Sequence, residues 1–352
     1  MPRKNGPPAT RQRVSIRDVA RESGVSLSTV SNALSGKDCV TEKTRQKIEE
    51  VARRLGYRAS GVARALRYGR TFTIGVLMAD VSNASMPDFL RGIEDVADRE
   101  KCSLLLCNTD DLIEKQLAHM RVLLERQVDG LVLVSQHCDS PEIRQLLDAG
   151  TPSVLLQRRS PRYKDDYVGA DNREGMLSAI DHLVALGHKR IGLMRGPVQS
   201  STATEKLEAF REAVASRGLD PDPGLIVQGN YLVEGGYQAA SRLMDLPKRP
   251  TAIIAANDMS AMGVLNAASE RGLSIPRDLS LVGWDDVELA SFPFIDLTTL
   301  HLPKREMGAA AATLLMERIH KKRRVKTKEV ILPIELMVRG STGPAPGIRR
   351  RA

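Results

Sequence analysis

Four side chains near the start of the chain have sizes and hydrogen-bonding groups that suit contact with DNA. Val30, Ala33 and Leu34 recur at helical spacing and predict the buried face of a short helix. The opposite face of the same helix carries Leu27, Ser28, Ser31 and Asn32. Short polar side chains can reach base edges and phosphates without filling the major groove. An ordinary three-helix bundle with no DNA role explains the same residues, so this pattern alone leaves both interpretations open.

Three short helices are expected to position this face. The first follows Ser15, a good N-cap, and ends at Gly24, because glycine tolerates the positive φ of a tight turn. The second begins after Ser26, and the third runs from about Thr41 to Leu55, where Gly56 ends it. A short helix, a glycine turn and a second helix with a Ser/Thr/Asn face are typical of a helix-turn-helix.

The charge distribution favours a polyanion as the partner of this head. Residues 1–70 hold 16 Lys and Arg against 6 Asp and Glu, whereas residues 71–352 hold 36 against 37. Solvation alone would distribute basic residues over both parts. A basic head on a nearly neutral body therefore indicates a polyanion partner, such as double-stranded DNA, for the head only.

Beyond residue 71 the pattern predicts an α/β core. Short apolar runs alternate with amphipathic helical stretches: TIGVLM, SLLLC, GLVLV and SVLL, followed by RIGLM, LIVQG, AIIAA and LSLVGW. Strands of this length separated by helices form parallel sheets. Two such series predict two doubly wound parallel-sheet lobes, of the type found in periplasmic binding proteins, and ligands of such folds bind at the carboxyl ends of the strands.

A family resemblance covers nearly the whole chain. The stretches SIRDVARESGVSLSTVSNAL, TEKTRQKIEEVARRLGY and SGVARALR resemble the head of the LacI/GalR family of bacterial transcriptional regulators, and the match continues to about residue 340. Such an ordered series of motifs is a specific signal. It implies a sequence-specific regulator, a repressor, whose operator affinity is controlled by a small molecule bound between the lobes.

The resemblance also implies how the chain is divided. We expect a helix-turn-helix domain over residues 14–58, a hinge over 59–70, a two-lobed core over 71–340 and a disordered basic tail over 341–352. Within the core, the first lobe is expected to take residues 71–162 and 294–322, and the second lobe 163–293 and 323–340.

Ten positions of the family's DNA contacts carry over to this chain. In the second helix, the implied base readers are Leu27, Ser28 and Asn32, and the implied phosphate contacts are Ser26, Thr29 and Ser31. In the hinge, the implied minor-groove residues are Ser60, Ala63, Arg64 and Leu66. Leu66 would act as an apolar wedge between base pairs, and the bent DNA would gain further contacts.

Polar residues at the expected strand ends are the candidates for effector contacts. The set comprises Asp80, Ser85, Ser135, Arg158, Thr202, Lys206, Tyr231 and Asp258. Matching to the family favours Arg158, Lys206, Tyr231 and Asp258, since a guanidinium donates as a fork and a carboxylate accepts from hydroxyls or amines. In the GWDD motif, Asp285 and Asp286 are expected to be structural.

Departures from the family pattern bear on the effector. Many members have Asn-Pro-Phe-Phe where this chain has Asn83-Ala84-Ser85-Met86, so the aromatic platform for a neutral sugar ring is missing. With Arg158 and Lys206 retained, we expect a small polar anion, such as a sugar acid or sugar phosphate. The alternative is a ligand-independent DNA-binding protein with a decayed pocket.

Other function classes fit the sequence less well. No GxSxG, HExxH or P-loop motif is present, so we expect neither an enzyme nor a cofactor. Four cysteines without CxxC spacing predict reduced thiols and no metal site. Without a long apolar run or a secretory signal, we expect a cytoplasmic protein without membrane contact, which argues against a transport role. The leucine-heptad tail of tetrameric relatives is missing, so we expect a homodimer.

Overall fold

The computed structural model describes residues 14–34, 38–57, 69–321 and 326–347. The chain divides into two compact units, Met1–Thr71 and Phe72–Ala352, and each is a separate structural body. The hinge residues Ser60, Ala63, Arg64 and Leu66 lie outside the described residues.

The first unit is a head of three helices, α1 (Ile16–Ser23), α2 (Leu27–Ala33) and α3 (Glu42–Leu55). At the start of α1, the Asp18 carboxylate accepts the backbone N–H of Ser15 at 2.9 Å. Gly24 ends this helix with φ of 69°. The Ser26 hydroxyl accepts the backbone N–H of Thr29 at 3.1 Å and begins α2. The predicted ends of these helices are therefore confirmed.

A small apolar core in the head buries one side of α2 and leaves the other side at the surface. Val19, Val30 and Ile48, one from each helix, are fully buried and pack together. Ala33 is buried on the same side of α2, whereas Leu27 is 46% exposed. The helical spacing of the apolar residues thus turns the polar face of α2 outward.

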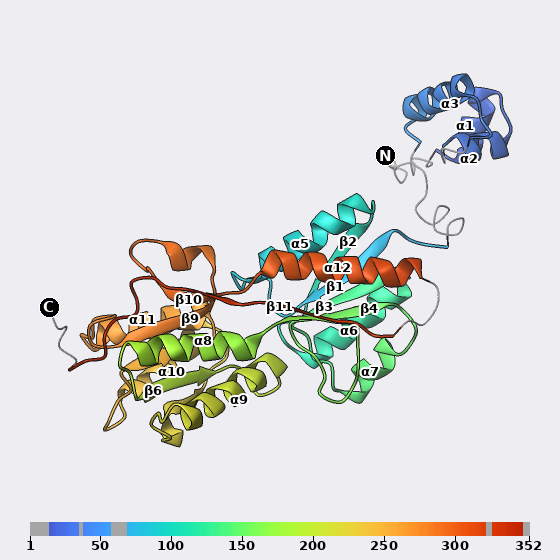
Figure 1. Cartoon of the computed structure of the whole chain (residues 1–352). Helices are drawn as coiled ribbons and strands as arrows, with labels where there is room; N and C mark the ends of the chain where they lie inside the picture. Colours follow the sequence, from blue (N-terminus) through green and yellow to red (C-terminus); the bar gives the residue numbers. More distant parts are fainter. Residues whose placement is uncertain (1–13, 35–37, 58–68, 322–325, 348–352) are drawn as a thin grey trace, which may run out of the picture. The chain divides into compact units, whose positions relative to one another are not determined.

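The second unit begins with a six-stranded parallel sheet in the order β11-β5-β4-β3-β1-β2. Its strands are β1 (Thr73–Met78), β2 (Ser103–Asn108), β3 (Gly130–Val134), β4 (Ser153–Leu156), β5 (Tyr167–Ala170) and β11 (Glu329–Leu332). Helices α5 (Met86–Arg99) and α12 (Lys304–His320) cover one face, and α6 (Ile113–Glu125) and α7 (Pro141–Leu147) cover the other (Figure 1).

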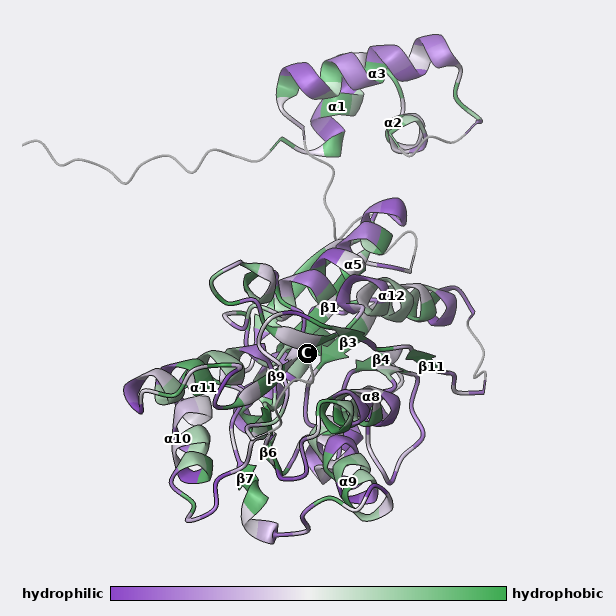
Figure 2. Ribbon diagram, turned by 60° about the vertical axis from the view of Figure 1, so that its left-hand side comes forward, coloured by the Kyte–Doolittle hydropathy of each residue, from purple (hydrophilic) through white to green (hydrophobic). Residues whose placement is uncertain are grey.

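Alternating side chains of the strands join this sheet to its two helical layers. Ile74 and Val76 pack in the core shared with α5 and α12, whereas Leu77 packs in the core shared with α6. Because helices cover both faces, the strands are almost continuously apolar (Figure 2).

A second six-stranded sheet forms the other lobe, in the order β12-β10-β9-β8-β6-β7. Its strands are β6 (Ile191–Arg195), β7 (Ile226–Gln228), β8 (Ala252–Ile254), β9 (Ser280–Asp285), β10 (Thr298–His301) and β12 (Glu335–Met337). Only β12 runs antiparallel to its neighbour in this sheet. The helices are α8 (Asn172–Ala185), α9 (Ser201–Ser216), α10 (Val233–Met244) and α11 (Asp258–Glu270), with 3-10 turns η1 (Pro223–Leu225) and η2 (Glu288–Ser291). None of the helices in the described ranges is both long and apolar enough to cross a bilayer.

The expected lobe boundaries are wrong, although two doubly wound lobes are present. Strand β5 belongs to the first sheet and β10 to the second, so the first two crossings follow residues 170 and 301. The third crossing follows β11, which belongs to the first sheet. At each crossing, the chain thus forms one more strand in its current lobe than we expected before it passes to the other lobe. These strands are short, and β10 and β11 carry polar residues, so their pattern resembles that of loops.

The expected disordered tail is wrong for residues 341–347, whereas residues 348–352 lie outside the described ranges. Ser341 is buried, and its hydroxyl donates to the carbonyl of Leu281 at 2.6 Å. The same oxygen accepts the backbone N–H of Thr298 at 2.8 Å. Ala345 is also buried, and its N–H donates to the carbonyl of Leu186 at 2.9 Å. Residues of this segment therefore form hydrogen bonds with backbone groups inside the second lobe.

Candidate functional site

The six DNA-contact candidates of the head lie on α2 or at its N-cap. Leu27 and Ser28 are exposed, and Ser31 and Asn32 are half-buried. The Ser26 hydroxyl caps the helix and also lies 2.8 Å from the hydroxyls of Ser28 and Thr29. This hydroxyl cluster presents several donors and acceptors at the first turn of α2, where the helix dipole favours a phosphate.

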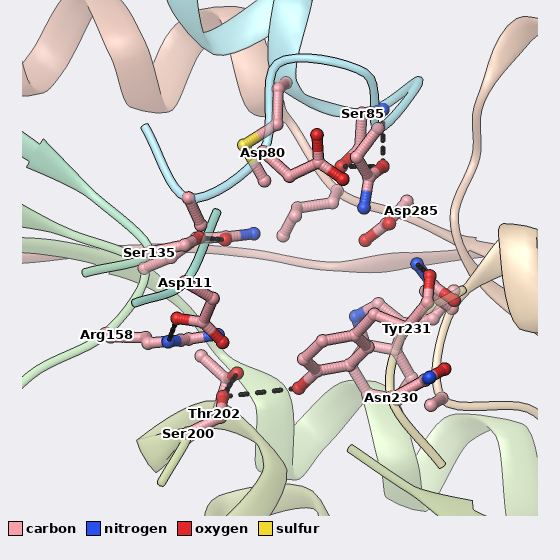
Figure 3. Close-up of a pocket in the computed structure, with 18 of the residues that line it drawn as sticks. Asp80, Ser85, Asp111, Ser135, Arg158, Ser200, Thr202, Asn230, Tyr231 and Asp285 are labelled. Atoms are coloured by element: carbon pink, nitrogen blue, oxygen red, sulfur yellow. Dashed lines mark hydrogen bonds and ion pairs between the residues drawn. The ribbon is translucent and has the colours of Figure 1, made fainter. Parts of the chain in front are cut away.

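A cavity of about 470 Å³ lies between the two lobes of the second unit. Most of its polar lining comes from residues at a strand end or within three residues after it. Seven of the eight predicted effector residues line it, namely Asp80, Ser85, Ser135, Arg158, Thr202, Lys206 and Tyr231 (Figure 3). The general expectation for doubly wound folds, a pocket at the carboxyl ends of the strands, therefore holds here.

Backbone conformations that are rare outside glycine concentrate at this cavity. Among the described residues, eleven that are not glycine have positive φ. Six of these line the cavity: Asp110, Asp111, Ser135, Gln157, Tyr231 and Asp285. Such conformations cost free energy and persist where the surrounding structure enforces them, which is common at binding sites.

On the wall formed by the first lobe, Arg158 is held by Asp111. Its Nη1 lies 2.6 Å from Oδ1 and its Nη2 3.2 Å from Oδ2 of the carboxylate. His137 Nε2 lies 3.3 Å from the same Oδ1. Burial alone would raise the pKa of Asp111, but hydrogen bonds from His137 and Arg158 lower it overall. The hydrogen bond to Asp111 in turn raises the pKa of His137.

The wall formed by the second lobe contains Lys206, Trp284 and Asp285. The Lys206 Nζ lies 3.6 Å from the centroid of the Trp284 ring and donates to the carbonyl of Ala256 at 3.3 Å. Burial lowers the pKa of Lys206 to about 7, although nearby carboxylates oppose the shift. Burial also raises the pKa of Asp285, against the opposing charges of Lys206 and Lys304.

An aromatic side chain completes this wall. The Tyr231 hydroxyl lies 3.2 Å from the hydroxyl of Ser200 (Figure 3). A Cβ at Gly196 would lie 2.2 Å from the Tyr231 hydroxyl, so the absence of a side chain there makes room for the ring. Tyr231 therefore presents an aromatic ring to the cavity from the second lobe.

The positions of Asp258 and Asp285 are the reverse of those expected from the sequence. Asp258 is fully buried and does not line the cavity. Its carboxylate accepts the backbone N–H of Val287 at 2.9 Å and the hydroxyl of Thr299 at 2.5 Å. Asp285 lines the cavity instead, whereas Asp286 is structural as expected and binds Arg339 at 2.7 Å.

Replacing Asp258 by alanine is expected to lower the free energy of unfolding by about 1–3 kcal/mol, because the N–H of Val287 and the hydroxyl of Thr299 lose their acceptor inside the lobe. Asp258→Asn keeps an acceptor oxygen and should cost less. Urea denaturation of both variants measures the difference. Equal stability of Asp258→Ala and wild type would contradict a structural role.

The sequence-based set missed several polar residues that line the cavity: Asp111, Gln157, Asn172, Asn230 and Asp285. A signal existed for some of them. Asp111 lies four residues after the predicted strand SLLLC, and Asp285 directly follows the predicted strand LSLVGW. Asn172 had no such signal, because it begins α8 after the unrecognised strand β5.

Residues 15–60 of the chain match the family described as bacterial regulatory proteins, lacI family. Residues 180–342 match the periplasmic binding protein-like domain. Catabolite control protein A of Priestia megaterium is 33% identical over 330 residues, which is 94% of this chain and 99% of that protein. The HTH-type transcriptional repressor PurR of Vibrio atlanticus (strain LGP32) is 33% identical over 87% of this chain and 92% of its own length.

Solved structures agree with these relatives. The Lac repressor dimer bound to operator and the anti-inducer ONPF matches with a TM-score of 0.85 and 27% identity, over 94% of this chain and all of that one. A complex of the transcriptional regulator CelR with cellobiose matches with a TM-score of 0.72 and 28% identity over 94% of this chain and 100% of that one. The chain belongs to the LacI family of bacterial regulatory proteins and is a DNA-binding transcription regulator with a ligand-binding core.

Proposed function

We propose that this regulator is a homodimeric repressor whose operator affinity is switched by a small polar molecule bound between the lobes. The observation that carries the proposal is that one chain combines an exposed polar face on α2 with a separate unit containing a cavity of about 470 Å³. A basic head supplies the charge for phosphate contacts. The DNA-binding helices and the ligand site thus lie in different structural units, and allosteric control requires two such distinct sites.

The DNA half of the proposal assigns base reading to Leu27, Ser28 and Asn32 and phosphate contacts to Ser26, Thr29 and Ser31. The exposure of Leu27 and Ser28 supports the first assignment, and the hydroxyl cluster around Ser26 supports the second. For the hinge, we propose minor-groove contacts by Ser60, Ala63 and Arg64, with Leu66 as the wedge.

Asn32→Ala is expected to change the preferred base at one or two operator positions, at a loss of about 1–3 kcal/mol on the original base, because an amide can pair with a base edge in a bidentate way. Ser31→Ala is the matched control on the same helix and should weaken all sequences about equally. Selection of bound sites from randomised DNA measures both effects. An unchanged motif for Asn32→Ala contradicts its assignment, and the lack of any selected motif for wild type contradicts the proposed function.

The proposed homodimer has support from apolar side chains at the edge of the first sheet. Strand β2 is an edge strand, and Leu106 on it is 45% exposed. Val81 and Leu112, in loops next to the end of β2, are 44% and 47% exposed. A second copy would cover these groups and the open strand edge.

The ligand-independent alternative receives less support. A decayed pocket would be expected to fill with side chains, whereas this cavity is open and lined by six residues held at positive φ. The curated relatives are transcriptional regulators, which supports a cytoplasmic location and a function without catalysis. A thermal-shift screen of sugars, sugar acids, nucleosides and amines, followed by operator binding with each hit, tests the effector half. The absence of any ligand that alters operator affinity would contradict it.

A further inference from the structure

The guanidinium of Arg158 in the cavity is already hydrogen-bonded to a carboxylate of the protein. It is 5% exposed, and two of its nitrogens donate to the two oxygens of Asp111. A carboxylate or phosphate is the group that an arginine fork would otherwise bind in this geometry. Asp111 therefore stands in the place that an anionic ligand would take.

A second side chain, that of His137, reinforces the position of Asp111. His137 Nε2 lies 3.0 Å from the Asp111 carbonyl oxygen and 3.3 Å from its Oδ1. The side chain of Asp111 is 33% exposed, whereas those of His137 and Arg158 are 13% and 5% exposed, so the carboxylate is the most accessible group of this cluster. A ligand entering from the cavity meets the carboxylate first.

The remaining charges of the cavity do not favour an anion either. The charged side chains that line it are four carboxylates and two cations, namely Asp80, Asp110, Asp111, Asp285, Arg158 and Lys206. With Arg158 paired, Lys206 is the remaining cation of this lining. Burial lowers the pKa of Lys206 to about 7, so near neutral pH part of the population is uncharged.

We propose that Asp111 is a specificity-determining residue of the effector site, which holds Arg158 and thereby excludes carboxylates and phosphate esters in favour of uncharged or cationic ligands. This inference rests on the proposed function, because it names the ligand class of the same pocket. It replaces the sugar acid or sugar phosphate expected from the sequence. That expectation relied on Arg158 and Lys206 as two cations free to bind an anion, whereas Arg158 is paired with Asp111 and burial lowers the pKa of Lys206.

The neighbouring carboxylate gives a matched control. Asp110 also lines the cavity and also has positive φ, 51° against 55° for Asp111. Its carboxylate, however, binds Lys115 and Asn108 rather than Arg158. Asp110→Asn and Asp111→Asn therefore change the charge of the cavity equally, and only the second releases the guanidinium. Asparagine tolerates positive φ well, so both replacements suit the backbone.

The experiment measures binding of inorganic phosphate to the full-length protein by calorimetry and by phosphorus NMR line width. Asp111→Asn is expected to bind phosphate about tenfold or more tightly than wild type, and Asp110→Asn to gain much less. Asp111→Glu, which keeps a carboxylate, should resemble wild type. Asp111→Gly provides a second variant without a carboxylate whose backbone accepts positive φ.

A titration of the His137 imidazole by NMR shows whether the cluster exists in solution. Its pKa should fall in Asp111→Asn, since the Asp111 carboxylate raises it in the native chain. Equal phosphate gains in Asp110→Asn and Asp111→Asn would overturn the inference. So would no gain in Asp111→Asn and Asp111→Gly, or wild-type binding of phosphate as tight as that of Asp111→Asn. Operator selection by wild type, carried out separately, decides the proposed function, so the two failures can be told apart.

Discussion

A chain that lacks residues 1–71 is expected to lose sequence-specific operator binding, while its lobes keep their fold and ligand response. The division between the two compact units falls at this position, so the deletion interrupts neither sheet. The cationic excess is confined to residues 1–70, with 16 Lys and Arg against 6 Asp and Glu. Anisotropy titrations with a selected operator compare the fragment with the full chain. Operator binding by residues 72–352 as tight as that of the full chain would contradict the assignment.

The contribution of the basic head to DNA affinity can be measured from the salt dependence of operator binding by the full chain. A regulator that neutralises about 6–10 phosphates loses about 10³–10⁵ in affinity between roughly 50 and 200 mM salt, because counterions are released on binding. A chain that lacks only residues 1–13 is the control. It loses Arg3, Lys4, Arg11 and Arg13 but keeps α1 to α3. We expect it to show a weaker salt dependence with the same base preference.

Asp285→Asn is expected to weaken effector binding by about 10- to 100-fold, the range for a lost hydrogen bond to a charged group. Asp285 is the only carboxylate of the second lobe among the side chains that line the cavity. It is a buried residue with a backbone φ of 114°, and its side chain lines the cavity (Figure 3). The measurement is calorimetry with whichever hit of the ligand screen alters operator affinity.

Asp258→Asn is the matched control for this prediction. Asp258 is also a buried carboxylate of the second lobe, and burial raises its pKa to about 7. It differs from Asp285 in binding Val287 and Thr299 rather than lining the cavity. Asp258→Asn should therefore keep the effector affinity. If Asp258→Asn lost the effector and Asp285→Asn retained it, the sequence-based assignment would be restored and ours refuted.

The helix-turn-helix head was predictable from the sequence because its determinants are local. The caps Ser15 and Ser26, the turn at Gly24 and the apolar spacing of α2 all lie within a few residues of the groups they control. The eight apolar runs of the core likewise correspond to eight strands of the two sheets. Periodicity and capping act over one or two turns of chain, so a single sequence is enough to recognise them.

The lobe crossings were not predictable in the same way. Strands β5, β10, β11 and β12 are three or four residues long and several carry polar groups. What makes β11 a strand is its pairing with β5, more than 150 residues earlier in the chain. Which sheet a short segment joins depends on such distant partners, and no local pattern contains that information.

The sequence by itself determined that this chain has a basic helix-turn-helix head, two parallel-sheet lobes and a polar pocket at the strand ends. Only the tertiary structure decided which charged groups line the cavity. Asp258 turns away to Thr299 and Val287, Asp285 turns into the cavity, and Arg158 is held by Asp111. The physical reason is that a strand end fixes where a residue lies, whereas its partners are fixed by segments brought together only when the sheets form.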